Sequence, residues 1–317
     1  MATQLSPTRT IHCCDALEWL EQQPVLQGCS FVTSLPDISE FQGHGSHLTI
    51  QQYKSWFIRA AQLVLNRCPD DGVTIFFQTD IKVEGTLLNK AYLAQTAAEE
   101  TGHALLWHKI VCRVTPGTVS YSRPSYHHML CFSKGVRPTA AAATADVLPS
   151  AGDTTWARGM GTAACAAACR FVLQHTSTCT VVDPFCGHGT VLAVANELGL
   201  SAIGVEIGKK RAKQAERLSA AGLQLNKGSP WPLKQQQQEE EQQQQQQEEH
   251  DGSEGGGGDS SNSRECRQQQ QDTAGHLQPP HHPTPAQQQQ QQQHWQQQQQ
   301  QEEDTMQAAA QLASLAV

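Results

Sequence analysis

The sequence lacks the features of membrane and secreted proteins. No apolar run approaches the ~18 residues that a membrane-spanning helix needs, and no secretory signal pattern or Cys-x-x-Cys pair is present. The 11 cysteines are scattered, without the regular spacing of a disulfide framework. His44 and His47 have metal-ligand spacing but no third ligand, so no metal site is predicted. We therefore expect a soluble protein of a reducing compartment, cytoplasmic or nuclear, without a membrane partner.

The first 227 residues also lack an excess of charge of either sign. They contain 19 basic and 17 acidic residues, whereas residues 228–317 contain 3 basic and 13 acidic ones. The net charge of −8 therefore arises in the last third of the chain. A near-neutral region without a block of like charge disfavours a strong non-specific hold on nucleic-acid backbone, although a smaller basic face remains possible.

Residues 228–317 have few aliphatic residues and many glutamines. Glutamine accounts for 30 of these 90 positions, with a glycine run and His/Pro pairs between the glutamine tracts. Such a segment cannot bury enough apolar area to offset the entropy of ordering. We predict one folded domain over residues 1–227 and a disordered Gln-rich tail over 228–317, which is a candidate for binding protein partners.

Short β-branched and aromatic runs alternate with helical patterns in the first 227 residues. The runs that read as strands are 10–14, 30–34, 73–78, 105–113, 128–133, 179–183 and 202–207. The helical patterns are 16–22, 50–66, 87–101, 155–175, 190–198 and 209–220. The alternation predicts an α/β fold with a doubly wound, seven-stranded, mostly parallel sheet. A loop without a helix joins 105–113 to 128–133, which predicts an antiparallel strand at one edge.

A glycine-containing turn follows the buried strand that ends at Asp183. Gly187 and Gly189 permit positive φ and remove side chains, so the backbone can approach a ligand at the carboxyl edge of the strand. Glu206 lies 23 residues after Asp183, at the tip of the next strand, where a carboxylate can accept hydrogen bonds from ribose hydroxyls. The combination predicts a site for a cofactor that carries adenosine.

The run Asp183-Pro-Phe-Cys-Gly-His-Gly-Thr190, followed by Gly-Val-Glu206-Ile, resembles the cofactor half of S-adenosylmethionine-dependent methyltransferases. The order of the chain is similar to the circularly permuted amino-methyltransferases that act on DNA N6-adenine and N4-cytosine. The resemblance implies S-adenosyl-L-methionine as cofactor. It also implies that Asp15 contacts the cofactor near the adenine. Further cofactor contacts are implied for five residues of the quoted motifs, Asp183, Phe185, Gly187, Gly189 and Glu206. Residues 153–156 fall where a further cofactor contact of the family lies.

The loop Ser34-Leu35-Pro36-Asp37 stands where the family has its catalytic tetrapeptide of Asp, Asn or Ser, two prolines and an aromatic residue. In that motif, a polar side chain and a proline carbonyl accept the two N–H groups of the target amine, and the aromatic ring stacks on the extruded base. Ser34, Pro36 and Asp37 are thus the candidate catalytic residues. Leu35 replaces a proline and Asp37 replaces the aromatic residue. Asp37 could accept a proton instead, and Phe41 is a candidate replacement platform.

Several readings of the function stay open. In the first reading, the methyl acceptor is an exocyclic amine of a nucleic-acid base, in RNA or in DNA. The alternative acceptor is an amine on a protein or on a small molecule. The other class of reading is a cofactor-binding scaffold with an inactive catalytic loop. Only about 40 residues separate Lys134 from His175, and much of that interval reads as helix, so the target-reading region of DNA enzymes is not apparent. Arg113, Arg123 and Lys109 form either a small patch for an anionic substrate or a solvated face. Trp19, Trp56 and Trp107 read as core residues.

Overall fold

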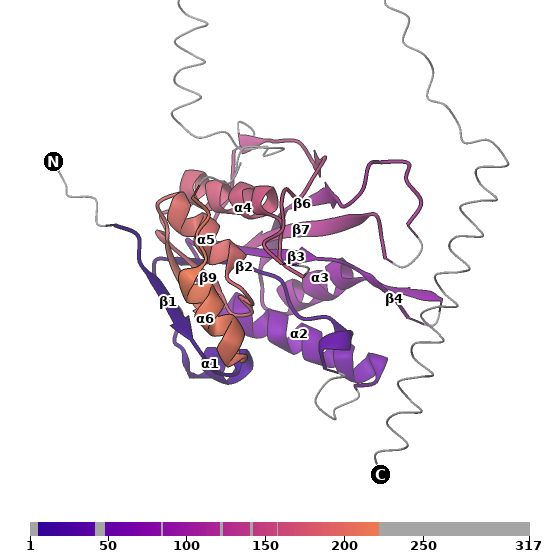
Figure 1. Cartoon of the computed structure of the whole chain (residues 1–317), viewed down its shortest axis with the longest axis horizontal. Coiled ribbons are helices and arrows are strands. Elements are labelled where there is room, and N and C mark those ends of the chain that lie inside the picture. The colour runs from indigo at the N-terminus through magenta and orange to yellow at the C-terminus, as the bar shows by residue number, and fades with distance from the viewer. Residues whose placement is uncertain are drawn as a thin grey trace, which may run out of the picture. The chain divides into compact units, whose positions relative to one another are not determined.

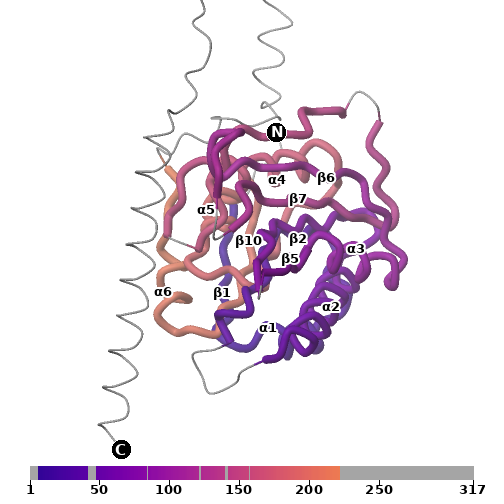
Figure 2. The backbone as a smooth tube through the Cα atoms, turned by 90° about the vertical axis from the view of Figure 1, so that its right-hand side faces the viewer, coloured from indigo at the N-terminus to yellow at the C-terminus, as the bar shows by residue number. Residues whose placement is uncertain are grey.

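The computed structural model describes residues 6–41, 48–83, 85–120, 123–139, 142–156 and 158–221. These residues form an eight-stranded sheet in the order β1-β10-β9-β2-β3-β7-β6-β8, together with a separate β4–β5 hairpin (Figures 1 and 2). The predicted Gln-rich tail lies outside the described residues, as do His44 and His47.

The sheet is mostly parallel, as the alternation of elements predicts. Its strands are β1 (Arg9–His12), β2 (Cys29–Thr33), β3 (Thr74–Gln78), β6 (Ala104–Cys112), β7 (Tyr126–Ser133), β8 (Val147–Leu148), β9 (Thr180–Asp183) and β10 (Ser201–Val205). The hairpin strands are β4 (Ile81–Val83) and β5 (Thr86–Leu88). Strands β1, β10, β9, β2 and β3 run in one direction, and β7 is antiparallel to both of its neighbours, β3 and β6.

Helices cover both faces of the sheet. They are α1 (Ala16–Gln22), α2 (Ile50–Arg67), α3 (Lys90–Glu100), α4 (Thr162–His175), α5 (Thr190–Glu197) and α6 (Lys209–Arg217), with a 3-10 helix η1 (Ile38–Glu40). One core cluster joins α1, α2 and α3 to one face, and a second joins α4, α5 and α6 to the other. The doubly wound α/β class is confirmed. No helix in the described part of the chain is both long enough and apolar enough to span a bilayer.

Local sequence explains where the helices begin. The Asp15 carboxylate accepts hydrogen bonds from the Leu17 and Glu18 backbone N–H groups and thereby caps α1. Thr49 and Gln52 form a reciprocal capping box at the start of α2. The alanine-rich helix α4 is buried along most of its length, and its Cys165 and Cys169 pack as small apolar side chains.

Two details of the predicted sheet are corrected. The reversed strand β7 is not at an edge, because β6 pairs with its outer side and β8 pairs with β6. The sheet has eight strands rather than seven, since the two-residue strand Val147–Leu148 is too short to give an alternating pattern. Four helices are also shorter than expected. Helix α3 begins after the β5 strand, with Asn89 as its cap, and α4 begins only after Gly161. Helices α5 and α6 end one and three residues before the predicted positions 198 and 220.

Candidate active site

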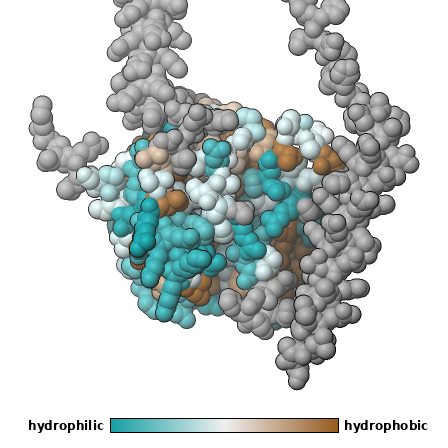
Figure 3. Space-filling view, in the orientation of Figure 1, coloured by the Kyte–Doolittle hydropathy of each residue, from teal (hydrophilic) through white to brown (hydrophobic). Residues whose placement is uncertain are grey.

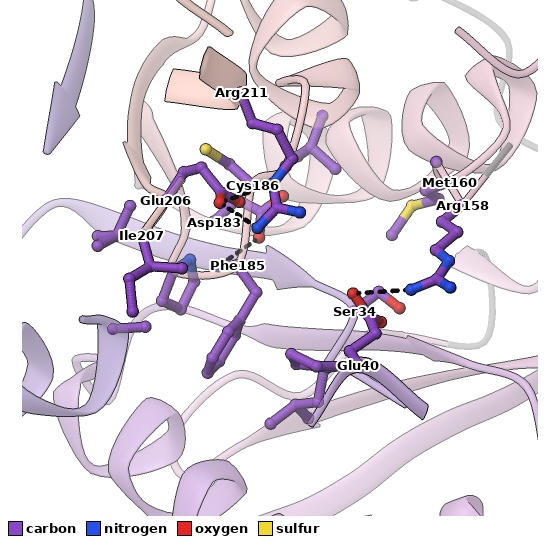
Figure 4. A pocket seen from close by; sticks show the side chains of 18 of the residues that line it. Ser34, Glu40, Arg158, Met160, Asp183, Phe185, Cys186, Glu206, Ile207 and Arg211 are labelled. Carbon is purple, nitrogen blue, oxygen red and sulfur yellow. Dashed lines mark hydrogen bonds and ion pairs between the residues drawn. The ribbon is translucent and has the colours of Figure 1, made fainter. Parts of the chain in front are cut away.

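A cavity of about 450 Å³ lies at the carboxyl ends of four adjacent parallel strands (Figure 4). Strands β1, β2, β9 and β10 are followed by Asp15, Ser34, Pro184 and Glu206, all of which line the cavity. Direct pairing of β9 with both β2 and β10 brings these strand ends together, although they come from opposite ends of the domain. Its size is within the range of ligand sites, and it is the crevice where open α/β sheets bind ligands.

Asp183 links the two halves of the cavity. Its side chain is buried, and its Oδ1 accepts hydrogen bonds from the Thr33 hydroxyl at 2.7 Å and the Phe185 N–H at 3.1 Å. Burial raises the pKa of this carboxyl from 3.8 to about 7, against the opposing effect of these two donors, and nearby Glu206 adds to the rise. The residue thus fixes both the glycine turn after β9 and the end of β2.

The glycine turn is shaped around an indole ring. Gly187 has φ of +53°, and a Cβ there would meet Cζ2 of Trp156 at 2.8 Å. Trp156 also stacks on the His188 ring, with 4.5 Å between centroids, and it lines the cavity. The predicted segment 153–156 therefore does reach the site. Gly189 has a different environment: it precedes α5 with φ of +83° and lies against Ala215 of α6, outside the cavity lining.

Glu206 is held at the cavity by Arg211. Its Oε1 accepts hydrogen bonds from the Gly208 N–H at 2.7 Å and from Nε of Arg211 at 2.8 Å, with a second guanidinium nitrogen at 2.7 Å (Figure 4). Every bond that the described residues make to this carboxylate falls on Oε1, so Oε2 stays available to a ligand. Arg211 was not predicted from the sequence, because a single arginine in a helix rich in basic residues carries no distinguishing signal.

Asp15 and Phe185, two further residues for which the resemblance implies cofactor contacts, are also at the cavity. Both line the cavity, and Asp15 additionally caps α1 through Oδ1. Phe185 belongs to an aromatic wall: its ring meets Trp56 edge-on with centroids 6.2 Å apart, and Trp56 meets Phe41 at 4.7 Å. Trp56, read as a core residue from the sequence, is only partly buried and lines the cavity. Phe41 lines it too.

The loop after β2 presents two of its three candidate residues to the cavity. Ser34 and Pro36 line it, and Leu35 packs into the core with 3% exposure. The Pro36 carbonyl accepts a hydrogen bond from the Tyr53 hydroxyl at 2.9 Å. Tyr53 is itself buried, and burial raises the pKa of its phenol far above the ordinary value. A neutral Tyr53 therefore ties the loop to α2.

Asp37 lies outside the cavity lining. Its carboxylate forms an ion pair with the ammonium group of Lys90, whose side chain is only 1% exposed, and lies 3.6 Å from a guanidinium nitrogen of Arg123. Burial lowers the pKa of Lys90, and Asp37 acts in the opposite direction. The Asp37 N–H donates to Glu40, which pairs with Arg158 at the cavity wall. Asp37 thus joins a network that holds the loop.

No group of three metal-ligating side chains occurs within the described ranges.

Of the three cations predicted to cluster, Arg113 and Arg123 lie within electrostatic range of each other. Lys109 differs, since its Nζ lies 3.2 Å from the Asp146 carboxylate.

The chain is similar to known DNA methylases in part of its sequence and in its fold. A DNA methylase family model matches residues 170–217. The PvuII DNA methyltransferase, described as cytosine-N4-specific, superposes with a TM-score of 0.52 at 18% identity, covering 68% of this chain and 88% of that one. The protein TTHA0409 of Thermus thermophilus, solved in complex with S-adenosyl-L-methionine, gives a TM-score of 0.50 at 20% identity, covering 66% of this chain and 91% of that one. No curated protein matches the chain.

The segment that the family model matches contains β9, α5 and β10, which border one side of the cavity. The solved structures share the fold over about two thirds of the chain. The chain is thus similar to DNA methylases over residues 170–217, and it shares the fold of these two solved proteins.

Proposed function

We propose that this chain uses S-adenosyl-L-methionine to methylate an exocyclic amine of a nucleic-acid base. The observation that carries the proposal is the pairing of β9 with β2, which brings the glycine turn and the Ser34 loop to one cavity. The DNA methylase family makes DNA the first acceptor to test, and RNA remains the second.

The residues of the cavity fit the cofactor. Gly187 leaves open backbone beside Trp156, and Oε2 of Glu206 is free to accept from ribose hydroxyls. Asp15 borders the side expected to receive the adenine, with Phe185 as an apolar surface. The cofactor supplies an activated methyl group together with its own leaving group. The TTHA0409 complex, a protein of the same fold, agrees with this assignment.

The acceptor side requires groups that orient an amine. The Ser34 hydroxyl and the second lone pair of the Pro36 carbonyl can accept the two N–H bonds of a base amine. Accepting these bonds draws the nitrogen lone pair out of conjugation with the ring. The role of Asp37 is then to hold the loop, because its carboxylate is engaged by Lys90 and Arg123.

A cofactor-binding scaffold is the second candidate function. It is favoured by the commitment of Asp37 to an ion pair and by the Tyr53 hydrogen bond already accepted by Pro36. Both contacts stabilise the loop in a way that does not itself require a substrate.

Calorimetry of the full chain with S-adenosyl-L-methionine tests the cofactor assignment. Glu206→Gln should weaken affinity by about 1–3 kcal/mol, because a charged hydrogen-bond acceptor is lost. Glu197→Gln makes the same change at an exposed position of α5, outside the cavity lining, and should leave affinity unchanged. Equal affinity in the Glu206 variant and the wild type would remove Glu206 from the site.

Transfer of labelled methyl groups to DNA, RNA, protein and small amines then separates the functions. Incorporation into a nucleic-acid base supports the proposal. Tight cofactor binding without transfer to any acceptor would establish the scaffold function instead.

A further inference from the structure

A pair of arginines lies beside the loop that we assign to the methyl acceptor. Arg113 follows β6 and Arg123 precedes β7, so the same connection carries both, at the carboxyl edge of β6. Both side chains are exposed. The Arg113 guanidinium donates to the Pro124 carbonyl at 2.8 Å, which anchors it to this connection. The Asp37 contact of Arg123 places the pair next to Pro36, at the rim of the cavity.

The positive charge of this pair is not balanced by its neighbours. Asp37 is the carboxylate nearest the pair, and the buried Lys90 ammonium already neutralises it. Asp80 is buried below, where its two oxygens bond the Lys90 N–H and the His128 ring. No carboxylate of the described residues forms an ion pair with Arg113. Lys90, Arg113 and Arg123 therefore set three positive charges against the two carboxylates Asp37 and Asp80, which leaves one positive charge in excess beside the exposed guanidinium groups.

The electrostatic effect of the pair is visible in its surroundings. Burial lowers the pKa of Arg113, and Arg123 lowers it further. His127 is also affected: burial lowers its pKa to about 3, with Arg113, His128 and Arg123 adding to the decrease. His127 is thus neutral at physiological pH, and an anion near the arginines would relieve their mutual repulsion.

The strand order separates this pair from the cofactor half. β7 and β6 lie on the β3 side of β2, whereas β10 and β1 lie beyond β9 on the opposite side. A second basic surface, on α6, follows β10 and therefore belongs to the cofactor side; its exposed cations include Lys209 and Lys213. Hydrophilic side chains cover this face in Figure 3. Of the two basic surfaces, the arginine pair is the one beside Ser34 and Pro36.

We propose that Arg113 and Arg123 each bind a backbone phosphate of the nucleic-acid strand that carries the acceptor base. The planar guanidinium fork matches two phosphate oxygens, which gives direction as well as attraction. Such contacts fix the register of a strand without reading its sequence. The inference rests on the proposed function, since it assigns a strand to the acceptor side, and it supplies part of the missing target-binding region.

The test compares the full-length double variant Arg113→Gln/Arg123→Gln with the matched control Lys209→Gln/Lys213→Gln. Binding of labelled single-stranded DNA and RNA is followed by fluorescence anisotropy over a series of salt concentrations. Cofactor affinity and thermal unfolding midpoints are measured in parallel. The arginine variant should bind roughly tenfold more weakly, and its salt slope should fall by about 1.4, because two phosphate contacts are lost. Cofactor affinity and the unfolding midpoint should be unchanged.

The outcomes distinguish the site from the function. If the wild type methylates nucleic acid and the arginine variant retains its affinity and salt slope, the phosphate site is wrong and the function stands. A larger loss in the lysine control would place the strand on α6 and would also overturn the site. If the wild type binds cofactor but methylates only an acidic peptide or a small amine, both the site and the nucleic-acid function fall.

Discussion

The two sides of the cavity differ in how closely their residues follow the methyltransferase pattern. On the cofactor side, Asp183, Gly187 and Glu206 all line the cavity and are residues for which the resemblance implies a cofactor contact. On the acceptor side, Asp37 is turned into a network with Lys90 and Arg123. In the proposed function, the shape of a fixed cofactor constrains the first side residue by residue. The second side needs only a loop held in place, and a buried ion pair can supply that support.

The largest expected effect concerns the support of the acceptor loop. Asp37→Asn should lower the free energy of unfolding by about 3–5 kcal/mol, because it leaves the buried Lys90 ammonium without a counter-charge. Lys90→Met should cost less, since Asp37 is partly exposed and retains Arg123. Urea unfolding measures both. The double variant Asp37→Asn/Lys90→Met should be more stable than Asp37→Asn alone; additive losses would show that the pair does not hold the loop.

A smaller effect is expected in the pH dependence of the free energy of unfolding, through Asp183 on the cofactor side. The pKa of Asp183 is about 7 in the folded protein and 3.8 ordinarily, so the folded state binds this proton more tightly. The free energy of unfolding should therefore fall as pH rises from about 4 to about 7, by roughly 3 kcal/mol. Asp183→Asn should abolish this contribution. The free energy of unfolding of the variant, relative to that of the wild type, should therefore be higher at pH 8 than at pH 5. Parallel pH profiles for variant and wild type would contradict the assignment.

The glycine turn tests whether close packing or conformation alone matters on the cofactor side. Gly187→Ala should weaken cofactor affinity by about 1–2 kcal/mol, because a Cβ at this φ of +53° meets Trp156 at 2.8 Å and displaces it. Gly199→Ala is the matched control: φ is +86°, but no atom lies within 4 Å of the added Cβ. The control should lose stability without losing affinity. Calorimetry that finds equal affinity losses would exclude a specific role for the Gly187 cradle.

The smallest effect is expected from removal of the Gln-rich segment. Both sides of the cavity are built from residues before position 222. Deletion of residues 228–317 should leave the unfolding midpoint and the cofactor affinity unchanged, as measured by calorimetry. A decrease in either quantity would show that the proposed domain boundary at residue 227 is wrong.

The sequence predicts the strands best where a strand is long and bounded by glycine or proline. All seven predicted strands are present, although their ends move by one or two residues. The β4–β5 hairpin is missed because each of its strands has only three residues. Helix α3 is predicted too early for the same reason, since Thr86–Leu88 are part of that hairpin.

At the site, sequence reasoning finds residues with a fixed spacing and misses those that reach it from elsewhere. Gly187 and Glu206 follow from the turn and the next strand tip. Lys90, Tyr53 and Arg211 contact the site residues through side chains on three helices, and no local pattern marks them. Gly189 has the expected spacing, but α6 occupies the space beside it.

The sequence by itself determined the order of strands and helices, the glycine turn after Asp183 and the acidic residue at position 206, because these depend on local periodicity and backbone freedom. Only the tertiary structure decided that β7 lies inside the sheet, that Asp37 pairs with Lys90, and that Arg123 reaches Asp37 beside the loop that lines the cavity. Those outcomes depend on which distant side chains are buried together, and the energy of a buried charge is set by neighbours that the local sequence does not specify.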